Sequence, residues 1–368
     1  MIAIGSCGHP CDDERIYHKQ INTLVTNGYL VKYFTYSSES YMDEDDNDNI
    51  EYRFFNSSEI SQKQYKKILF NLLNNEPPQI FHIHDMELLP IAFKLKKKHP
   101  DISIIYDVHE DLEAMWDTFS SYSGLIKKFI NTMLSKYEKQ YLSCVDQFIL
   151  ANRLANKKRY EQYNNCLIIE NFPLLEMTNH KNISNPTQLL YHGQLSDERG
   201  IAHLVDAFQI LSKKNSNLEL LLIGNYRKND FQKTLTTLVG NNEKIKILPQ
   251  VKHYEIWNYL KTAHIGIIPF KNVPLCQKNT PTKLFEYMLT DCAIVASDLK
   301  PIREFCNQSA SWAEPGDVNS LVKAISYYLD NNDKYIEHIR TNNDLIQTDY
   351  HWEAVSDKLL NLYRELLN

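Results

Sequence analysis

The sequence predicts an α/β protein built from two Rossmann-like domains, each with a doubly wound parallel sheet. Three observations lead to this prediction. With 368 residues, the chain has room for about two domains at roughly 100 to 200 residues each. Short apolar runs alternate with longer segments of helical period, which is the pattern of repeated strand-helix-strand units. The alternation stops in a stretch containing Pro and Asn, residues 171–186, and then starts again.

The strands are expected where the apolar runs lie. In the first domain the runs occupy residues 2–5, 31–36, 80–84, 102–107 and 147–150. In the second domain they occupy residues 189–193, 218–224, 245–248, 265–269 and 294–297. Residues 351–368 predict a final helix whose apolar face is made by Trp352, Val355, Leu359, Tyr363 and Leu366. The predicted parts are therefore two domains, residues 1–172 and 187–348, and a last segment, residues 349–368.

The composition excludes several classes of protein. Hydrophobic residues make up 43% and charged residues 23% of the chain, which is typical of a globular protein and not of a collagen-like or disordered one. The net charge of −6 argues against a general nucleic-acid binder. The seven cysteines lack paired CxxC spacing, so we expect no disulfide framework, no structural zinc site and a cytoplasmic location. No leader and no run of about 20 apolar residues is found, so any membrane contact is expected to be peripheral.

Parallel sheets of this kind bind ligands beyond the carboxyl ends of their strands. We therefore expect the functional site in a cleft formed by the loops of two facing domains.

The most informative segment is NTPTKLFEYML, residues 279–289. Thr280 is placed to cap a helix and Pro281 to take its first position, where the missing N–H costs nothing. The N–H groups at that helix end, together with Lys283, predict an anion site suited to a diphosphate. Glu286 could accept hydrogen bonds from vicinal hydroxyls such as those of ribose. A capped surface helix with a Lys–Glu pair is equally compatible with these residues.

A second segment, LLYHGQLSDERGI at residues 189–201, predicts a strand that ends at Gly193 and a helix that begins after Gly200. Gly193 would let the backbone approach a ligand, and Arg199 could neutralise a phosphate through two hydrogen bonds. A strand-turn-helix with a solvated arginine would have the same sequence.

The loop after the first strand carries a third set of candidates, Gly8, His9, Asp13 and Arg15. It is not a GxGxxG dinucleotide fingerprint, because no third glycine follows. Arg15 is a candidate phosphate ligand, although a pairing with a neighbouring carboxylate is equally compatible.

Two strand ends of the first domain carry histidines. IFHIHD places His82 and His84 on one face of a strand, and IIYDVHE places His109 just past a strand, where catalytic side chains tend to lie. His82, His84 and Asp85 resemble part of a metal site, but a third convincing ligand is missing, so packed histidines are favoured and no metal is expected. His109 is the candidate functional residue.

Taken together, these segments resemble the family 4 glycosyltransferases, which are group 1 glycosyl transferases with the GT-B architecture of two facing Rossmann-like domains. The matching segments run from DDERIYHKQ through HDMELLP, YDVHE, YHGQLSDERGIAHLVDAF, LLLIG, NTPTKLFEYM and AIVASD to HWEAV. The resemblance implies a nucleotide-sugar donor in the second domain and an acceptor in the first. It also implies that the final helix crosses back to the first domain.

The resemblance also implies roles for individual residues. Glu286 would hold the donor ribose, Arg199 would neutralise the leaving phosphate and His109 would lie near the donor sugar, so the implied catalytic set is His109, Arg199, Lys283 and Glu286. The implied donor-binding set is Gly193, Gly224, Val251, Lys278, Thr280, Pro281, Thr282 and Leu284. The loop with Gly8, His9, Asp13 and Arg15 takes the place of the family's Gly-Gly loop, in an Asp-x-Arg-Ile variant.

Two positions depart from the family pattern. Lys278 stands where the motif has its first glutamate, and a cation cannot accept the hydrogen bonds that a carboxylate would. Gln194 stands where the family usually has an arginine. The lost phosphate charge would have to come from Arg15, Lys278 or Lys283.

The activity implied by the resemblance is a retaining, metal-independent and cofactor-free transfer of a hexose or N-acetylhexosamine. The donor would be a UDP-sugar rather than a GDP-sugar, and the acceptor a hydroxyl of a lipid-linked glycan in bacterial surface polysaccharide synthesis, at the inner face of the cell membrane. Residues 125–142, with Lys127, Lys128, Lys136 and Lys139 among apolar residues, would lie at an anionic membrane surface or simply pack on the sheet. Two alternatives stay open: a sugar-nucleotide epimerase or hydrolase, and a non-catalytic accessory subunit that binds the sugar nucleotide.

Overall fold

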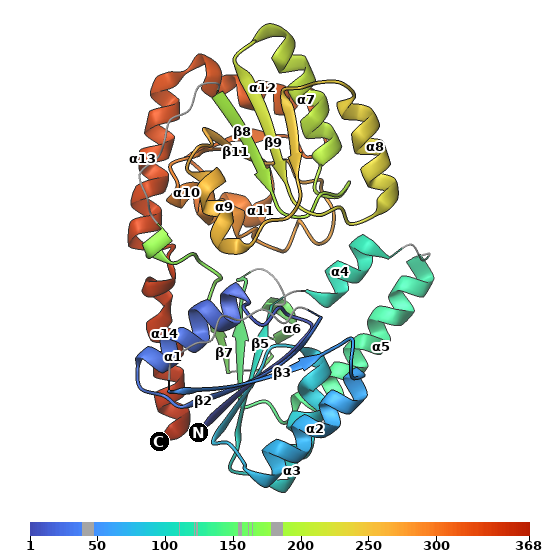
Figure 1. The fold of residues 1–368 in the computed structure, drawn as a ribbon, viewed down its shortest axis with the longest axis vertical. Coiled ribbons are helices and arrows are strands. Elements are labelled where there is room, and N and C mark those ends of the chain that lie inside the picture. The colour runs from blue at the N-terminus through green and yellow to red at the C-terminus, as the bar shows by residue number, and fades with distance from the viewer. Residues whose placement is uncertain are drawn as a thin grey trace. The chain divides into compact units, whose positions relative to one another are not determined.

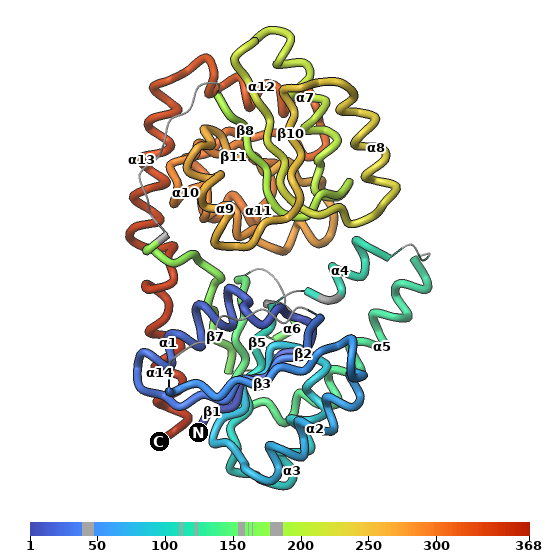
Figure 2. The backbone as a smooth tube through the Cα atoms, viewed as in Figure 1, coloured from blue at the N-terminus to red at the C-terminus, as the bar shows by residue number. Residues whose placement is uncertain are grey.

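The chain folds into two compact units, each with its own sheet (Figures 1 and 2). The computed structural model describes residues 1–38, 48–109, 111–120, 122, 124–153, 157–160, 162–163, 165–177 and 187–368. The amino-terminal unit consists of Met1–Asn171 with Val355–Asn368, and the carboxyl-terminal unit of Phe172–Ala354. Every pair of neighbouring strands runs parallel in both sheets, so the predicted fold class is confirmed.

The sheet of the amino-terminal unit has the strand order β3-β2-β1-β4-β5-β6-β7. The strands are β1 (Ile2–Cys7), β2 (Val31–Ser37), β3 (Ile50–Asn56), β4 (Ile80–Ile83), β5 (Ser103–Val108), β6 (Gln147–Leu150) and β7 (Cys166–Ile168). β1 is buried along its whole length, because it lies between β2 and β4 under helices. The order reverses between β1 and β4, and ligands bind at such a switch point in doubly wound sheets.

The helices of this unit connect the strands. They are the π-helix η1 (Glu14–Ile21), α1 (Asn22–Thr26), α2 (Gln62–Asn75), the 3₁₀ turn η2 (Met86–Leu88), α3 (Leu89–Lys98), α4 (Leu112–Phe119), α5 (Gly124–Leu142) and α6 (Lys157–Tyr160). α2 begins with a complete capping box, in which the Ser61 side chain accepts from the Gln64 N–H and the Gln64 side chain accepts from the Ser61 N–H. α2 and α3 bury Tyr65, Leu69 and Leu95 in the core.

The sheet of the carboxyl-terminal unit has the order β10-β9-β8-β11-β12-β13 and reverses between β8 and β11. Its strands are β8 (Thr187–His192), β9 (Leu218–Ile223), β10 (Ile245–Leu248), β11 (Ile265–Ile268), β12 (Ala293–Ser297) and β13 (Ala310–Ala313). Its helical segments are η3 (Leu175–Met177), α7 (Ile201–Lys214), α8 (Asn229–Val239), α9 (His253–Leu260), α10 (Lys283–Leu289), α11 (Lys300–Cys306), α12 (Val318–Asp330) and α13 (Asn332–Thr348).

Three strands of the structure were not among the predicted ones. β3 lies at an edge and is only half-buried, so its sequence IEYRFFN lacks a continuous apolar run. β7 has three residues, and β13 has four residues that are mostly small. Short edge strands carry little periodicity, which explains why the sequence pattern missed them.

The last helix, α14 (Trp352–Leu367), begins in the carboxyl-terminal unit and joins the amino-terminal unit from Val355 onward. Leu359 and Tyr363 of its predicted apolar face are fully buried. Tyr363 also places its hydroxyl 2.8 Å from Nδ1 of His82 in β4, so a specific polar contact fixes this helix in the amino-terminal unit. Among the described residues, no helix has the length and apolar character that crossing a membrane requires.

Candidate functional site

In the carboxyl-terminal unit, two predicted site cations lie beside one aromatic ring. Lys283 Nζ lies 5.2 Å from the centre of the Phe270 ring and 5.2 Å from that of Tyr191, and Arg199 lies 4.5 Å from the Phe270 ring. Gly193 also belongs to this group, because its backbone lies so close to Lys283 that a Cβ on this residue would be 3.4 Å from Lys283 Nζ. These residues come from the ends of β8 and β11, the loop before α7 and the start of α10. They therefore meet where the strand order reverses.

Two glycines are required for this loop cluster to form. Gly200 adopts φ 70° at the start of α7, and a Cβ there would lie 1.8 Å from the Pro269 carbonyl oxygen. Gly224 adopts φ 153°, and a Cβ there would lie 1.9 Å from the Gly193 carbonyl oxygen. Gly224, predicted as a donor-binding residue, thus has a clear role in bringing the ends of β8 and β9 together.

The charges of these two cations lie close together. Among the described residues, neither Lys283 nor Arg199 forms an ion pair with an acidic side chain; Arg199 contacts the Cys276 thiol at 4.0 Å. Burial, and then the nearby Arg199 charge, lower the pKa of Lys283 to about 7, against the opposing effect of the Glu286 charge. Two neighbouring like charges disfavour each other, and an anion beside them relieves this. The two cations are therefore suited to an anionic group.

Glu286 pairs with two histidines and not with Lys283. Its Oε2 lies 3.0 Å from His192 Nε2, and its Oε1 lies 3.3 Å from His253 Nε2. Burial alone would raise the pKa of Glu286, but the two histidines hold it well below its usual range. The carboxylate thus stays ionised and keeps free lone pairs for a hydroxyl ligand. A surface helix with a Lys–Glu pair is wrong, because all residues of α10 are buried.

The start of α10 differs from the prediction. The helix begins at Lys283 with Thr282 as its N-cap, and Thr282 makes no side-chain capping bond. Thr280 precedes the helix by three residues, and its hydroxyl lies 3.4 Å from the Pro301 carbonyl oxygen. The predicted cap at Thr280 and first position at Pro281 are therefore wrong, because the chain makes another turn before the helix begins.

The remaining predicted donor residues lie in the same unit with varied exposure. Leu284 and Pro281 are buried, Thr282 is exposed, and Lys278 and Val251 are half-buried. At Gln194, where the resemblance predicts a missing charge, the Oε1 atom lies 3.4 Å from Arg227 Nη1 in the segment after β9. Arg227 thus brings a cation close to this position from another part of the sequence.

In the amino-terminal unit, predicted residues meet at the β1–β4 switch point. His9 lies between two carboxylates, with Nδ1 3.3 Å from Asp13 Oδ2 and Nε2 3.4 Å from Asp85 Oδ1. Burial would lower the pKa of His9, but these two partners raise it to about 10. Asp13 also accepts from the backbone N–H groups of Arg15 and Ile16 and so caps η1. Gly8, which precedes His9 directly, is exposed and adopts φ 116°.

Arg15 is not available to a phosphate in this structure, so its prediction as a phosphate ligand is corrected. Its Nε and Nη2 donate to the two oxygens of Asp107 at 3.0 Å each, and Gln20 also donates to Asp107. The side chains of Arg15 and Asp107 are 4% and 0% exposed. Burial would raise the pKa of Asp107, but Arg15 holds it well below its usual range.

His109, the predicted functional histidine, lies against this buried pair. Its Nε2 lies 3.0 Å from His84 Nδ1 and 3.7 Å from Asp107 Oδ2. The His109 ring also stands edge-on to His9, with ring centres 4.8 Å apart. The carboxyl ends of β4 and β5 and the loop after β1 thus bring three histidines together.

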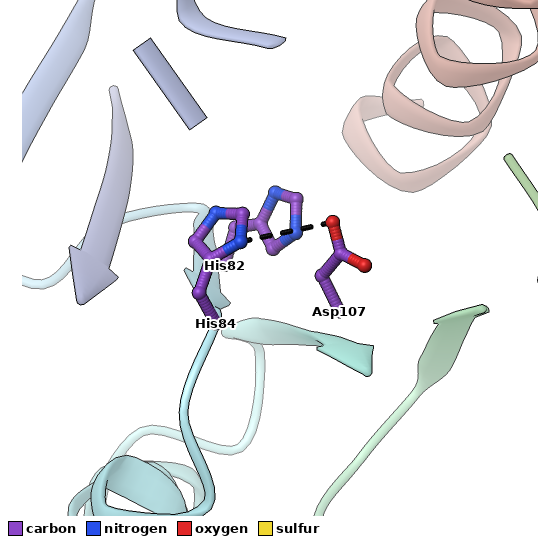
Figure 3. A group of neighbouring side chains, drawn as sticks. All are labelled: His82, His84 and Asp107. Carbon is purple, nitrogen blue, oxygen red and sulfur yellow. Dashed lines mark ion pairs between the residues drawn. The ribbon is translucent and has the colours of Figure 1, made fainter. Parts of the chain in front are cut away.

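His82, His84 and Asp107 form a group with metal-ligating atoms within 4.8 Å of one another (Figure 3). Asp85, the carboxylate that the sequence suggested, instead binds His9 and the Cys7 N–H. Two features disfavour a metal here. Arg15 occupies both oxygens of Asp107, and the His82 and His84 rings are stacked at 26°, so their nitrogens do not converge. The group is a buried hydrogen-bonded cluster.

Sequence reasoning missed four residues of these two clusters, namely Asp107, His192, Arg227 and His253. Asp107 and His192 are polar residues at the ends of apolar strands, YDV and LLYH, and that position was the available signal. His253 is the first residue of α9 and Arg227 lies in the loop before α8, and neither position carries a motif. Only the tertiary structure brings them to the site.

Comparisons with known proteins agree with this arrangement. Residues 172–346 match the family model described as "Glycosyl transferases group 1". No curated protein sequence matches the chain.

Among solved structures, sucrose-phosphate synthase from Thermosynechococcus elongatus has a TM-score of 0.77 at 15% identity, with 100% of this chain and 99% of that chain covered. Anabaena HepE in complex with UDP has a TM-score of 0.75 at 11% identity, with 99% and 100% covered. The structure described as "Trehalose-6-phosphate from E. coli bound with UDP-2-fluoro glucose" has a TM-score of 0.72 at 13% identity, with 98% of each chain covered.

Proposed function

Because residues 172–346 match the model of the group 1 glycosyl transferases, we propose that the protein transfers a hexose or N-acetylhexosamine from a UDP-sugar to a hydroxyl of a glycan. The observation that carries this proposal is the pair of neighbouring cations, Arg199 and Lys283, neither of which forms an ion pair with a described carboxylate. A nucleoside diphosphate supplies the missing negative charge. Two solved structures of the same fold contain UDP or a UDP-sugar, which favours uridine as the donor base.

The proposed reaction places each group of the carboxyl-terminal unit in a role. The acceptor oxygen attacks the anomeric carbon, the bond from that carbon to the diphosphate oxygen breaks, and its electron pair stays on the diphosphate. The hydroxyl proton passes to that departing oxygen, on the same face of the sugar, so the configuration is retained. Arg199 and Lys283 stabilise the developing charge in the role that a metal ion has in other enzymes, and Glu286 holds the ribose hydroxyls. For His109 of the amino-terminal unit, the resemblance implies a role toward the transferred sugar.

A thermal-shift titration tests this function first. A ligand that binds only the folded protein raises its stability with the logarithm of saturation, so a UDP-sugar and UDP are expected to raise Tm and matched GDP compounds are not. The donor that raises Tm is then incubated with candidate acceptors, and release of UDP is measured with and without each acceptor. Release or isomerisation of sugar without an acceptor would favour a hydrolase or an epimerase. No shift with any donor at millimolar concentration would contradict the proposal and favour an accessory subunit, as the Lys278 departure suggests.

The affinity for UDP is expected to decrease as the pH rises from 7 to 9. Lys283 has a pKa of about 7 before binding, and an adjacent diphosphate favours its charged form, so binding takes up a proton above pH 7. The affinity for UDP is highest below this pKa, where Lys283 is already charged, and decreases by up to about tenfold per pH unit above it. Calorimetry in two buffers of different ionisation enthalpy measures the uptake at pH 8. Lys283→Met should bind UDP without taking up a proton. A wild-type affinity for UDP that is constant from pH 7 to 9 would contradict the role given to Lys283.

We propose further that the acceptor is lipid-linked and that α5 binds an anionic membrane surface. Leu125, Phe129 and Met133 form a stripe at four-residue spacing and are 85%, 65% and 55% exposed. Beside it lies an open pocket of about 600 Å³, whose cationic lining is Lys127, Lys128, Lys136 and Lys139. α4 and the first turns of α5 extend away from the sheet of their unit (Figure 1). An exposed apolar stripe flanked by lysines is typical of an interfacial helix.

Co-sedimentation with vesicles containing phosphatidylglycerol is expected to detect this contact at low salt. The double variant Leu125→Glu with Phe129→Glu should reduce the bound fraction at least about tenfold. It removes two apolar side chains that the membrane would bury, and burying each is worth about 1.5–3 kcal/mol. Ile336→Glu is the matched control, since Ile336 is also an exposed apolar residue, at 39%, but lies on α13. Equal binding of wild type to neutral and anionic vesicles, or none to either, would contradict the proposal.

A further inference from the structure

The amino-terminal cluster contains a hydrogen bond to which the proposed reaction assigns no role. His84 Nδ1 and His109 Nε2 lie 3.0 Å apart, and both atoms lie 3.7 Å from Asp107 Oδ2. A hydrogen bond between two imidazole nitrogens needs an N–H on one ring and a lone pair on the other. One of the two rings is therefore the donor, and this choice decides which nitrogen of His109 carries a proton.

The surroundings of His84 decide the direction of this bond. Its side chain is fully buried, and its Nε2 has no hydrogen-bond partner among the described residues. Burial holds the pKa of His84 well below its usual range, so the ring is neutral and carries a single proton. On Nε2 that proton would make a buried, unpaired N–H, which folded proteins avoid more strongly than an unused lone pair. On Nδ1 it bonds His109 and faces the Asp107 carboxylate.

We propose that His84 is a positioning residue that makes Nε2 of His109 a hydrogen-bond acceptor and so places the His109 proton on Nδ1. His109 Nε2 then accepts the bond from His84, and His109 Nδ1–H remains as a donor for a ligand. The role of that donor toward the transferred sugar rests on the proposed function, whereas the tautomer itself does not. Asp107 supports the arrangement, because Arg15 and Gln20 hold its oxygens in place below the two rings.

The two other histidine rings of the cluster are engaged by partners of their own. From the loop after β1, His9 presents its ring edge-on, with its own nitrogens engaged by Asp13 and Asp85. From β4, His82 is stacked on His84 with ring centres 4.5 Å apart and bonds Tyr363 rather than His109. His84, which directly follows β4, is thus the ring that contacts His109. His82 provides a matched control, because it lies two residues earlier with its ring stacked on that of His84.

Nitrogen NMR of the full-length protein labelled with ¹⁵N-histidine tests the proposal at pH 8. The signals of His109 are identified by their loss in His109→Gln. In the wild type, Nδ1 of His109 is expected to be protonated and Nε2 to be unprotonated. His84→Phe keeps an aromatic ring against His82 but removes the donor, so the Nε2–H form of His109 should appear. His84→Asn, whose amide lies near the place of Nδ1, should restore the original pattern, and His82→Asn should leave it unchanged.

An Nε2–H pattern for His109 in the wild type would overturn the proposal, and so would a pattern unchanged in His84→Phe. If His84→Phe does not fold, the spectra of the wild type and of His84→Asn test the proposal in its place. In turnover assays, His84→Phe is expected to lower kcat about tenfold with the donor KM within twofold, because the donor is held by the other unit. Failure of every donor to react with the wild type would refute the proposed function and leave the tautomer result valid.

Discussion

Replacing Arg199 by Ala is expected to lower turnover at least about a hundredfold, and Glu286→Ala is expected to have an effect of similar size. Arg199 lies over the Phe270 ring beside Lys283, and in the proposed function it supplies one of two cations for the leaving diphosphate. Its charge matters most in the transition state, so kcat should fall more than the donor affinity. Glu286 acts through bound donor hydroxyls, so its loss should also raise KM. Steady-state kinetics with the donor found by thermal shift measures both.

Lys271→Ala is the matched control for these variants. Lys271 follows Phe270 directly, but its Nζ is paired with Asp197 at 2.7 Å, so it is a compensated cation in the same loop. Its turnover should stay within about twofold of the wild type, since exposed ion pairs contribute little. Circular dichroism and Tm confirm that each variant is folded. Near-normal rates in both Arg199→Ala and Glu286→Ala would refute the site.

Asp107→Ala is expected to destabilise the amino-terminal unit by about 3–5 kcal/mol, because it leaves the buried Arg15 guanidinium without its partner. Both side chains are almost completely buried, so water cannot replace the lost hydrogen bonds. The low pKa of Asp107 has a consequence for acid stability. Its contribution is present above the unfolded pKa of an aspartate and is lost as the pH falls through the folded value. Urea unfolding at pH 7 and at pH 3 to 4, followed by circular dichroism, measures the free energy of unfolding.

Two further variants show whether the effect comes from the buried charge. Glu51→Ala removes the partner of Arg53 in the same unit, but these side chains are 41% and 45% exposed, so a loss below about 1 kcal/mol is expected. The double variant Asp107→Leu with Arg15→Met removes both charges and should recover much of the stability of Asp107→Ala. A loss for Asp107→Ala no larger than that for Glu51→Ala would contradict the assignment.

The fold could be predicted because its main signals are local. β1, β4, β5, β8, β9 and β12 are apolar runs, since parallel strands covered by helices are buried on both faces. The position of the site followed from the same rule, because the switch points between β1 and β4 and between β8 and β11 collect the strand-end residues. Lys283, Arg199 and Glu286 were instead predicted from the segments 279–289 and 189–201. β3 escaped prediction because an edge strand needs no continuous apolar run.

The partners of these residues could not be predicted. From the sequence, Arg15 could pair with a neighbouring carboxylate or with a phosphate. Its actual partner, Asp107, lies 92 residues away in the chain. His253 reaches Glu286 across 33 residues, and Tyr363 reaches His82 across 281. Long-range pairs of this kind carry no periodicity.

The sequence by itself thus determined two doubly wound sheets, the strand ends that carry the site and the chemical type of most site residues. The tertiary structure decided which charges are neutralised and which are left for a ligand. Arg15 is neutralised by Asp107, whereas Lys283 and Arg199 lie together beside Phe270 and form no ion pair with a carboxylate of the described residues. The physical reason is that a side chain's charge and protonation depend on burial and on its nearest partner, and both are set by residues distant in the chain.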